Sequence, residues 1–244
     1  MENGVRIVPL GERAFIVHYG GGIDPDTHRK VLEFTRILEE QPFPGFVEAV
    51  PSYGAAAVYY DPIAVVKTSW KVRDAQSQVV RWLEERSERV RARAAAVAGA
   101  GAGALTENAV EIPVCYCSEC GPDLPFVAER NQLSAEDVVS IHTSRSYKVY
   151  MIGFMPGFPY LGGMSERISA PRLSTPRERV PAGSVGIAGS QTGVYPFASP
   201  GGWRLIGRTP LPLFQPDRTP PSVLTAGDTV YFKPVSHGDG SGGM

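Results

Sequence analysis

The sequence predicts an α+β protein in two parts, a small α+β domain followed by a domain of many short strands. Two observations point to this fold class. The first part of the chain alternates strand-like and helix-like patterns in the order β-β-α-β-β-α. Beyond residue 108, short apolar runs are separated by glycine and proline, a pattern typical of a barrel or a sandwich.

A stretch rich in glycine and alanine separates the two parts. Small residues without an apolar period are typical of a linker. We therefore predict an N-terminal α+β domain at residues 1–98, a linker at 99–108, a β-rich domain at 109–236 and a disordered tail at 237–244.

Apolar spacing places the elements of the N-terminal domain. Asp24 or Asp26 is expected to cap a helix whose apolar residues recur three and four positions apart, and Pro42 ends it. The dipeptide Asp61-Pro62 is expected to close the second pair of strands. The predicted strands are 5–10, 14–19, 46–50 and 55–60, and a second helix runs from about 70 to 96.

Local signals also place the elements of the second domain. Ser134 and Asp137 have the spacing of a capping box, so a helix is expected to begin there and to end near His142. A short helix is predicted after Asp123. Strands are predicted at 109–116, 147–152 and 228–234.

Composition and charge narrow the function classes. The chain carries 24 basic and 25 acidic residues, a net charge of −1, so nothing favours a nucleic-acid partner or an anionic membrane surface. No run approaches the roughly 20 apolar residues that span a bilayer. The N-terminus lacks a basic region followed by an apolar run, so no secretory signal is predicted. We expect a cytoplasmic protein.

Residues 151–214 combine fixed turns with arginines. Proline and glycine recur every few residues, and their alternation specifies turns one by one. Arg177 follows Pro176 and Arg208 follows Gly207, so both guanidinium groups are expected to be pre-organised for a carboxylate or a phosphate. The segment predicts a surface that holds a small polar ligand.

The three cysteines form the pattern C-x-C-x-x-C at Cys115, Cys117 and Cys120. A structural zinc ion needs four nitrogen or sulfur ligands, and the histidine closest in sequence, His142, lies well downstream. Thiols without a metal are therefore expected.

Two further motifs favour ordinary structure. Residues 182–186 resemble the nucleophile elbow G-x-S-x-G, but Ala182 stands where the first glycine belongs, so a plain turn is predicted. His142, a lone histidine at a helix end, is read first as a capping or packing residue, with acid–base catalysis as the alternative.

Several long strings resemble one known family. GFMPGFPYLGG, PRLSTPRERVPAGSVGIAGSQTGVYP and SPGGWRLIGRTP, with GPDL and IHTS upstream, are similar to the family of the bacterial 5-oxoprolinase B subunit. The same family contains the histidine-kinase inhibitor KipI and the first subunit of allophanate hydrolase. The resemblance implies a cyclophilin-like β-barrel at 109–236 after the small α+β domain. Cys117 and Cys120 depart from the family pattern.

The resemblance also implies partners and a reaction. Members of this kind work with the related C subunit and with an A subunit, and the complex opens 5-oxo-L-proline to L-glutamate with ATP and magnesium. Within the matched strings we assign, by residue type and position, candidate catalytic groups and candidate substrate-binding groups. The catalytic candidates are Arg177, Gln191, Arg208 and His142, and the substrate-binding candidates are Ser184, Tyr195, Gly183 and Gly189.

Specific roles follow for these residues. Arg177 and Arg208 are expected to hold a carboxylate or phosphate, and Gln191 and Tyr195 to donate to the amide oxygen. Backbone amides near Gly183 and Gly189 are expected to form an anion nest.

Two alternatives remain open. One is a regulatory protein of the KipI type that docks on a histidine kinase, and the other is a subunit of an allophanate hydrolase or urea carboxylase. All three share the fold, so the fold cannot choose among them. The 5-oxoprolinase component is the favoured prediction.

Overall fold

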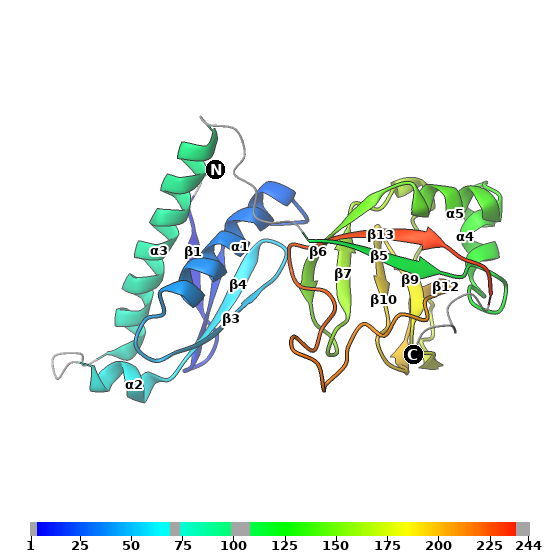
Figure 1. Ribbon diagram of the computed structural model, residues 1–244. Coiled ribbons are helices and arrows are strands. Elements are labelled where there is room, and N and C mark those ends of the chain that lie inside the picture. Colours follow the sequence, from blue (N-terminus) through cyan, green and yellow to red (C-terminus); the bar gives the residue numbers. More distant parts are fainter. Residues whose placement is uncertain (1–3, 69–73, 99–107, 238–244) are drawn as a thin grey trace. The chain divides into compact units, whose positions relative to one another are not determined.

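The computed structural model describes residues 4–68, 74–98 and 108–237 (Figure 1). It divides into two compact units, Met1–Thr106 and Glu107–Met244. The division falls inside the predicted linker at 99–108. Of the predicted tail, His237 is described and 238–244 lie outside the described residues.

The first unit is a four-stranded antiparallel sheet with helices packed on it (Figure 1). Its strand order is β1-β2-β4-β3. This confirms the predicted β-β-α-β-β-α order and adds one short helix. The elements are β1 Arg6–Pro9, β2 Ala14–His18, α1 Pro25–Glu40, β3 Phe46–Pro51, β4 Ala55–Tyr60, α2 Pro62–Lys67 and α3 Ala75–Ala98.

Helix α1 begins and ends where its sequence signals place it. The side chain of Asp24 accepts a hydrogen bond from the Thr27 N–H at 2.8 Å, which satisfies one of the free amides of the first turn. Val31, Phe34 and Leu38 share the apolar face and are fully buried. The helix ends at Glu40, before Pro42.

The short helix α2 was not predicted. Asp61 and Pro62 were read as the end of a strand, but the Asp61 carboxylate accepts from the Ile63 N–H at 2.9 Å and begins a helix. The predicted start of the next helix at Trp70 lies outside the described residues, and α3 runs from Ala75.

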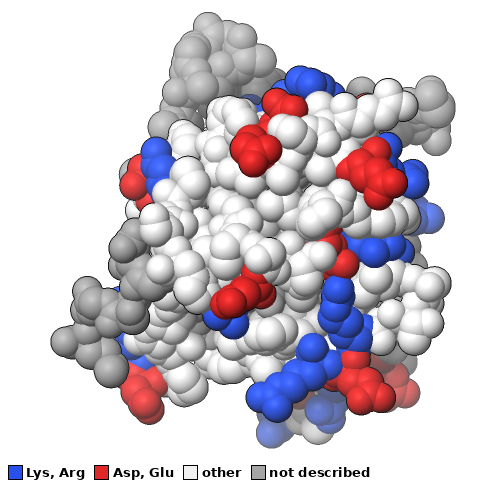
Figure 2. Space-filling view, turned by 90° about the vertical axis from the view of Figure 1, so that its right-hand side faces the viewer, with Lys and Arg blue, Asp and Glu red and all other residues white. Residues whose placement is uncertain are grey.

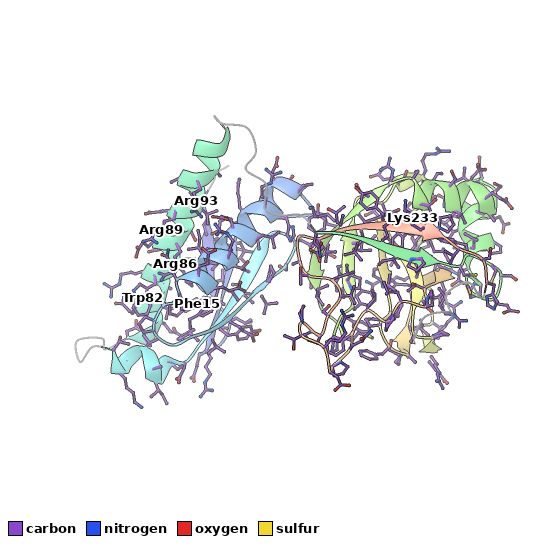
Figure 3. All side chains as sticks on the ribbon, in the orientation of Figure 1. Phe15, Trp82, Arg86, Arg89, Arg93 and Lys233 are labelled. Atoms are coloured by element: carbon purple, nitrogen blue, oxygen red, sulfur yellow. The ribbon has the colours of Figure 1, made fainter. Side chains whose placement is uncertain are left out.

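Arginines on α3 fasten this helix to α1 and to the loop after it. Figure 3 shows Arg86, Arg89 and Arg93 following one another along α3. Arg86 donates to the Gln41 carbonyl at 2.9 Å, and Arg93 pairs with Glu33 of α1. These cations therefore serve the packing of the first unit.

The second unit is a seven-stranded sheet that closes almost into a barrel (Figure 1). Its strand order is β12-β9-β10-β7-β6-β13-β5. The edge strands β5 and β12 meet at an isolated bridge, where Cys115 and Arg208 exchange two backbone hydrogen bonds of 2.9 Å each. The strands of this sheet are β5 Ala109–Val114, β6 Ser146–Ile152, β7 Pro159–Gly162, β9 Ser184–Ala188, β10 Gln191–Val194, β12 Arg204–Arg208 and β13 Thr229–Pro234.

Smaller elements complete this unit. They are α4 Leu124–Arg130, α5 Ala135–Thr143, the short helix η1 Glu166–Ile168, and the two-stranded pair of β8 Arg177–Val180 and β11 Ser199–Gly201. The capping box at the start of α5 is confirmed, because Ser134 and Asp137 bond each other's backbone N–H at 3.0 and 3.1 Å. The arrangement confirms an α+β fold with a cyclophilin-like barrel.

β13 and β5 are the one parallel pair in the described part of the sheet. Pro234 lies opposite Val114, and the Val235 N–H continues the pairing by donating to the Val114 carbonyl at 3.0 Å. The chain after β13 therefore runs beside the chain after β5, and this neighbourhood contains the candidate site.

Among the described helices, none has the length and apolar character needed to cross a bilayer.

Candidate functional site

A cavity of about 510 Å³ opens beside the bridge that closes the barrel. Five segments line it: the chain after β5, the turn before β9, the chain after β10, the end of β12 with the loop that follows it, and the chain after β13. The lining residues are Cys115, Cys120, Ala182, Gly183, Pro196, Arg208, Thr209, Pro210, Leu211, Pro212, Val235, Ser236 and His237. Of the predicted site residues, the cavity brings together Gly183 and Arg208.

Gly183 shapes the floor of this cavity. Its φ is +78°, and a Cβ at this position would lie 2.1 Å from the Thr209 carbonyl oxygen. Only glycine allows the loop after β12 to pack this closely on the turn. Ala182 and Gly183 form the predicted plain turn. Ser184, which follows it, is 2% exposed and does not present a nucleophile.

Arg208 supplies positive charge to the cavity. Its backbone is held by the bridge to Cys115, while its exposed side chain has no hydrogen-bond or ion-pair partner within the described residues. An arginine whose backbone is held in a strand and whose guanidinium group has no partner in the described protein is suited to bind a carboxylate or a phosphate.

Arg177 lies elsewhere, in an ion pair. Its Nη2 donates to Asp123 Oδ1 at 2.9 Å, and Arg204 Nη1 lies 3.7 Å from the same oxygen. The other carboxylate oxygen of Asp123 accepts from the buried Leu205 N–H at 2.7 Å. Arg177 was predicted, like Arg208, to hold a carboxylate or a phosphate. The carboxylate that it contacts in this structure is that of Asp123, in a network that sequence reasoning missed.

The hairpin of β9 and β10 separates the remaining predicted residues. Gly189 and Gln191 lie at its turn, whereas Ser184 and Tyr195 lie at its other end, about 13 Å away along the strand. Backbone amides near Gly183 and Gly189 were predicted to form an anion nest. The Gly183 N–H donates to the Tyr195 carbonyl and the Gly189 N–H to the Ala170 carbonyl, both at 2.7 Å, so neither amide is available to a ligand.

Tyr195 is a core residue. It is 2% exposed, and its ring packs edge-on against Phe158 at a centroid distance of 5.3 Å. Burial raises the pKa of its hydroxyl, which also accepts a hydrogen bond from the backbone of Trp203. The predicted role as a donor to a substrate amide is therefore not supported by its position.

His142 is fully buried among aromatic side chains. Its Nδ1 lies 2.8 Å from the Tyr116 hydroxyl and its Nε2 lies 3.0 Å from Thr192 Oγ1. Burial lowers its pKa to about 3, so the ring stays neutral near pH 7. The packing interpretation of His142 fits this position and the catalytic one does not, since both nitrogens are occupied inside the core.

The three cysteines converge on a histidine that sequence reasoning did not consider. His237 Nδ1 lies 3.7, 3.5 and 3.6 Å from the Sγ atoms of Cys115, Cys117 and Cys120. Hydrogen bonds from Cys115 and from the Cys120 backbone lower the pKa of Cys117 to about 7, while burial raises that of Cys120 to about 12. The thiol group was expected to lack a fourth ligand, but the parallel strand pair provides one.

Known proteins similar to this chain support one family. Residues 5–224 match the model of the carboxyltransferase domain, subdomain C and D. The chain is 48% identical to the 5-oxoprolinase B subunit of Bacillus subtilis (strain 168), over 96% of this chain and 94% of that protein. It is 39% identical to the 5-oxoprolinase B subunit of Escherichia coli O157:H7, over 96% and 97% of the two chains.

A solved structure supports the fold. The K. lactis urea amidolyase superposes with a TM-score of 0.70 at 20% identity, over 95% of this chain and 15% of that much longer chain. At this identity the likeness concerns the fold alone. From the family match and the two relatives, the chain belongs to the family of the carboxyltransferase domain, subdomain C and D, and is similar over 96% of its length to the 5-oxoprolinase B subunit.

Proposed function

We propose that this chain is the B subunit of an ATP-dependent 5-oxoprolinase, inactive alone, that opens 5-oxo-L-proline to L-glutamate together with the A and C subunits. The observation that carries the proposal is the 48% identity to the Bacillus subtilis protein, which extends over 96% of this chain. Likeness of fold alone would be weaker support, because one fold hosts many functions.

The cavity beside Arg208 suits the proposed substrate. 5-Oxo-L-proline is a small anion whose carboxylate matches a guanidinium group in geometry and charge. Opening an unstrained lactam requires activation of the amide, which ATP with magnesium supplies when bound to the complex. Arg208 would hold the carboxylate while Thr209 and the prolines after it shape the wall around the ring.

Exposed aromatic residues support the expectation of partner subunits. Phe154 is 65% exposed and has a φ of +65°, which is unusual for a bulky residue, and Phe197 is 39% exposed. Phe197 also follows Pro196, which lines the cavity. On the face shown in Figure 2, uncharged residues cover most of the described surface, and Lys and Arg side chains gather toward its lower right. Exposed aromatic side chains such as Phe154 and Phe197 are typical of interfaces.

Reconstitution tests the proposal. Purified chain is mixed with the candidate A and C subunits, and ATP-dependent glutamate release from 5-oxoproline is measured with all components and with each omitted in turn. We expect turnover only when all three proteins are present. An intact complex that releases ammonia from a urea-type substrate but no glutamate would contradict the proposal. Undiminished glutamate release without this chain would contradict it too.

We propose that this activity takes place in the cytoplasm, where ATP is supplied.

A further inference from the structure

Cys115, Cys117, Cys120 and His237 form a cluster that the proposed enzymatic function does not use. Their ligand atoms all lie within 4.8 Å of one another. Cys115 and Cys120 are 7% and 5% exposed, whereas the side chain of His237 is 52% exposed and closes the cluster from outside. The group is therefore three sulfurs presented by one loop, with a single imidazole lying over them.

The distances from His237 Nδ1 to the three sulfurs fit one tetrahedral ion. With Zn–S bonds of about 2.3 Å and a Zn–N bond of about 2.0–2.1 Å, a tetrahedral centre puts nitrogen and sulfur about 3.6 Å apart. His237 Nδ1 lies between 3.5 and 3.7 Å from all three sulfurs. Ordinary packing of a histidine on a cysteine does not require three equal distances.

The loop brings its sulfur atoms together. The N–H groups of Cys120 and Gly121 both donate to the Cys117 carbonyl, at 3.0 and 2.8 Å, which folds the loop into a tight turn. As a result, the Sγ atoms of Cys117 and Cys120 lie within 4.8 Å of each other and of the Cys115 Sγ atom.

The other ring nitrogen of His237 also has a partner. His237 Nε2 lies 3.5 Å from the carboxylate of Glu119, in the same turn that carries the cysteines. A metal-binding imidazole commonly donates its second N–H to a carboxylate, which fixes the tautomer and the ring orientation. Nδ1 is then left unprotonated and faces the sulfurs.

The barrel topology brings the fourth ligand to the loop. His237 is 120 residues from Cys117 in sequence, and the parallel register of β13 on β5 makes these two positions level with each other. The Val235–Val114 hydrogen bond extends that register beyond the strands. The histidine is thus positioned by the main sheet.

We propose that Cys115, Cys117, Cys120 and His237 bind one zinc ion, which fastens the chain after β13 to the loop after β5 at the rim of the cavity. Binding replaces the three thiol protons, which are released to solvent, and leaves the ion with four protein ligands. A tetrahedral site with four protein ligands has no open position for substrate, so the zinc is structural. This zinc site does not depend on whether the chain is part of an oxoprolinase.

Metal analysis tests the proposal on the full chain, purified under reductant and with any affinity tag removed. We expect about one zinc per chain in the wild type. Cys117→Ser and His237→Ala should raise the dissociation constant, measured against a competing chelator, by at least about 100-fold, and Glu119→Gln by about 10- to 100-fold. His18→Ala in the first unit is the matched control and should bind as the wild type does.

A second measurement identifies the ligands without relying on variants. Cobalt added to the metal-free chain should give the visible bands of a tetrahedral centre and thiolate-to-metal charge transfer. Zinc should protect all three cysteines from alkylation. Four results would overturn the proposal: a wild type that binds no zinc, a His237→Ala variant that binds like the wild type, a Cys117–Cys120 disulfide in the reduced preparation, or iron with inorganic sulfide in place of zinc.

Discussion

Asp123 Oδ1 lies 2.9 Å from Arg177 Nη2, and this pair joins the start of α4 to β8. The same carboxylate accepts the buried Leu205 N–H, so its removal leaves both a cation and an amide without their partner. Arg177 is 30% exposed, and water will screen part of the loss. We expect Asp123→Ala to lower the free energy of unfolding by about 3 kcal/mol.

Urea unfolding of the wild type and the variant measures this change. Glu178→Gln, on an exposed neighbour in β8, is the control and should stay within about 0.5 kcal/mol of the wild type. Equal midpoints for Asp123→Ala and Glu178→Gln would show that the ion pair contributes nothing.

Arg208 should matter for turnover and not for assembly. Arg208→Ala removes the guanidinium at the cavity while keeping the backbone bridge to Cys115. A lost charge-assisted hydrogen bond is worth about 1.5–3 kcal/mol, so we expect kcat/KM for 5-oxoproline to fall about 10- to 100-fold in the reconstituted complex.

The control for this experiment is Arg179→Ala, on an exposed arginine of β8 that does not line the cavity. Arg208→Lys should restore part of the activity, chiefly through a lower KM. Size-exclusion chromatography checks assembly. Wild-type rates for Arg208→Ala in an intact complex would remove Arg208 from the site.

Two glycines with positive φ should respond differently to alanine. At Gly183 the new Cβ would collide with the Thr209 carbonyl, whereas at Gly189 nothing lies within 4 Å. Gly189→Ala meets only the backbone cost of the left-handed region, about 1–2 kcal/mol. Gly183→Ala must also displace the loop after β12, so we expect a loss of at least about 3 kcal/mol. Thermal and urea unfolding of the two variants compare them directly, and similar losses would contradict this difference.

His142 should make the protein sensitive to acid. Its pKa is lowered by burial to about 3 in the folded state, compared with 6.5 in the unfolded chain. Between these values the unfolded state binds a proton that the folded state refuses, so stability falls as pH decreases below 6.5. From pH 7 to pH 5 the loss from this residue is about 2 kcal/mol.

A comparison of the wild type with His142→Gln isolates this contribution from groups common to both. The variant should be less stable at pH 7, since it loses ring packing, but its free energy of unfolding should vary less between pH 7 and pH 5. Parallel pH profiles for the two proteins would show that His142 is not buried as a neutral ring.

Zinc removal should destabilise the second unit. A ligand that binds only the folded state stabilises it by an amount that rises with its affinity. A chelator should therefore lower the melting temperature of the wild type by several degrees, in line with a loss of about 3 kcal/mol or more. His237→Ala should melt at the same temperature with and without chelator. A chelator effect of equal size in both proteins would mean that the ion lies elsewhere.

Sequence reasoning succeeded where the physical cause is local. The capping box of Ser134 and Asp137 spans three residues, and Asp24 with its following apolar period defines α1 without help from the rest of the fold. It missed α2 because six residues are too short for an apolar period to show, and Asp61-Pro62 suits a helix start as well as a turn.

Prediction from the sequence failed where the partner of a residue lies far away along the chain. Arg177 was expected to be free for a ligand because only its neighbour Pro176 was visible, whereas its partner Asp123 lies 54 residues away. His237 was assigned to a disordered tail, since nothing near it in sequence indicates the cysteines 117–122 residues earlier. A parallel strand pair between the two ends of the domain was the missing observation.

The hydrogen bonds around His142 have only one possible direction. Thr192 Oγ1 donates its proton to the Gly186 carbonyl at 3.0 Å, so it can only accept from His142 Nε2. Nδ1 is then an acceptor, and the Tyr116 hydroxyl must donate to it. The ring is thereby held as a single tautomer whose proton has no contact with water. Exchange of that proton with solvent requires an opening of the barrel that exposes His142, and its rate would report how often such an opening occurs.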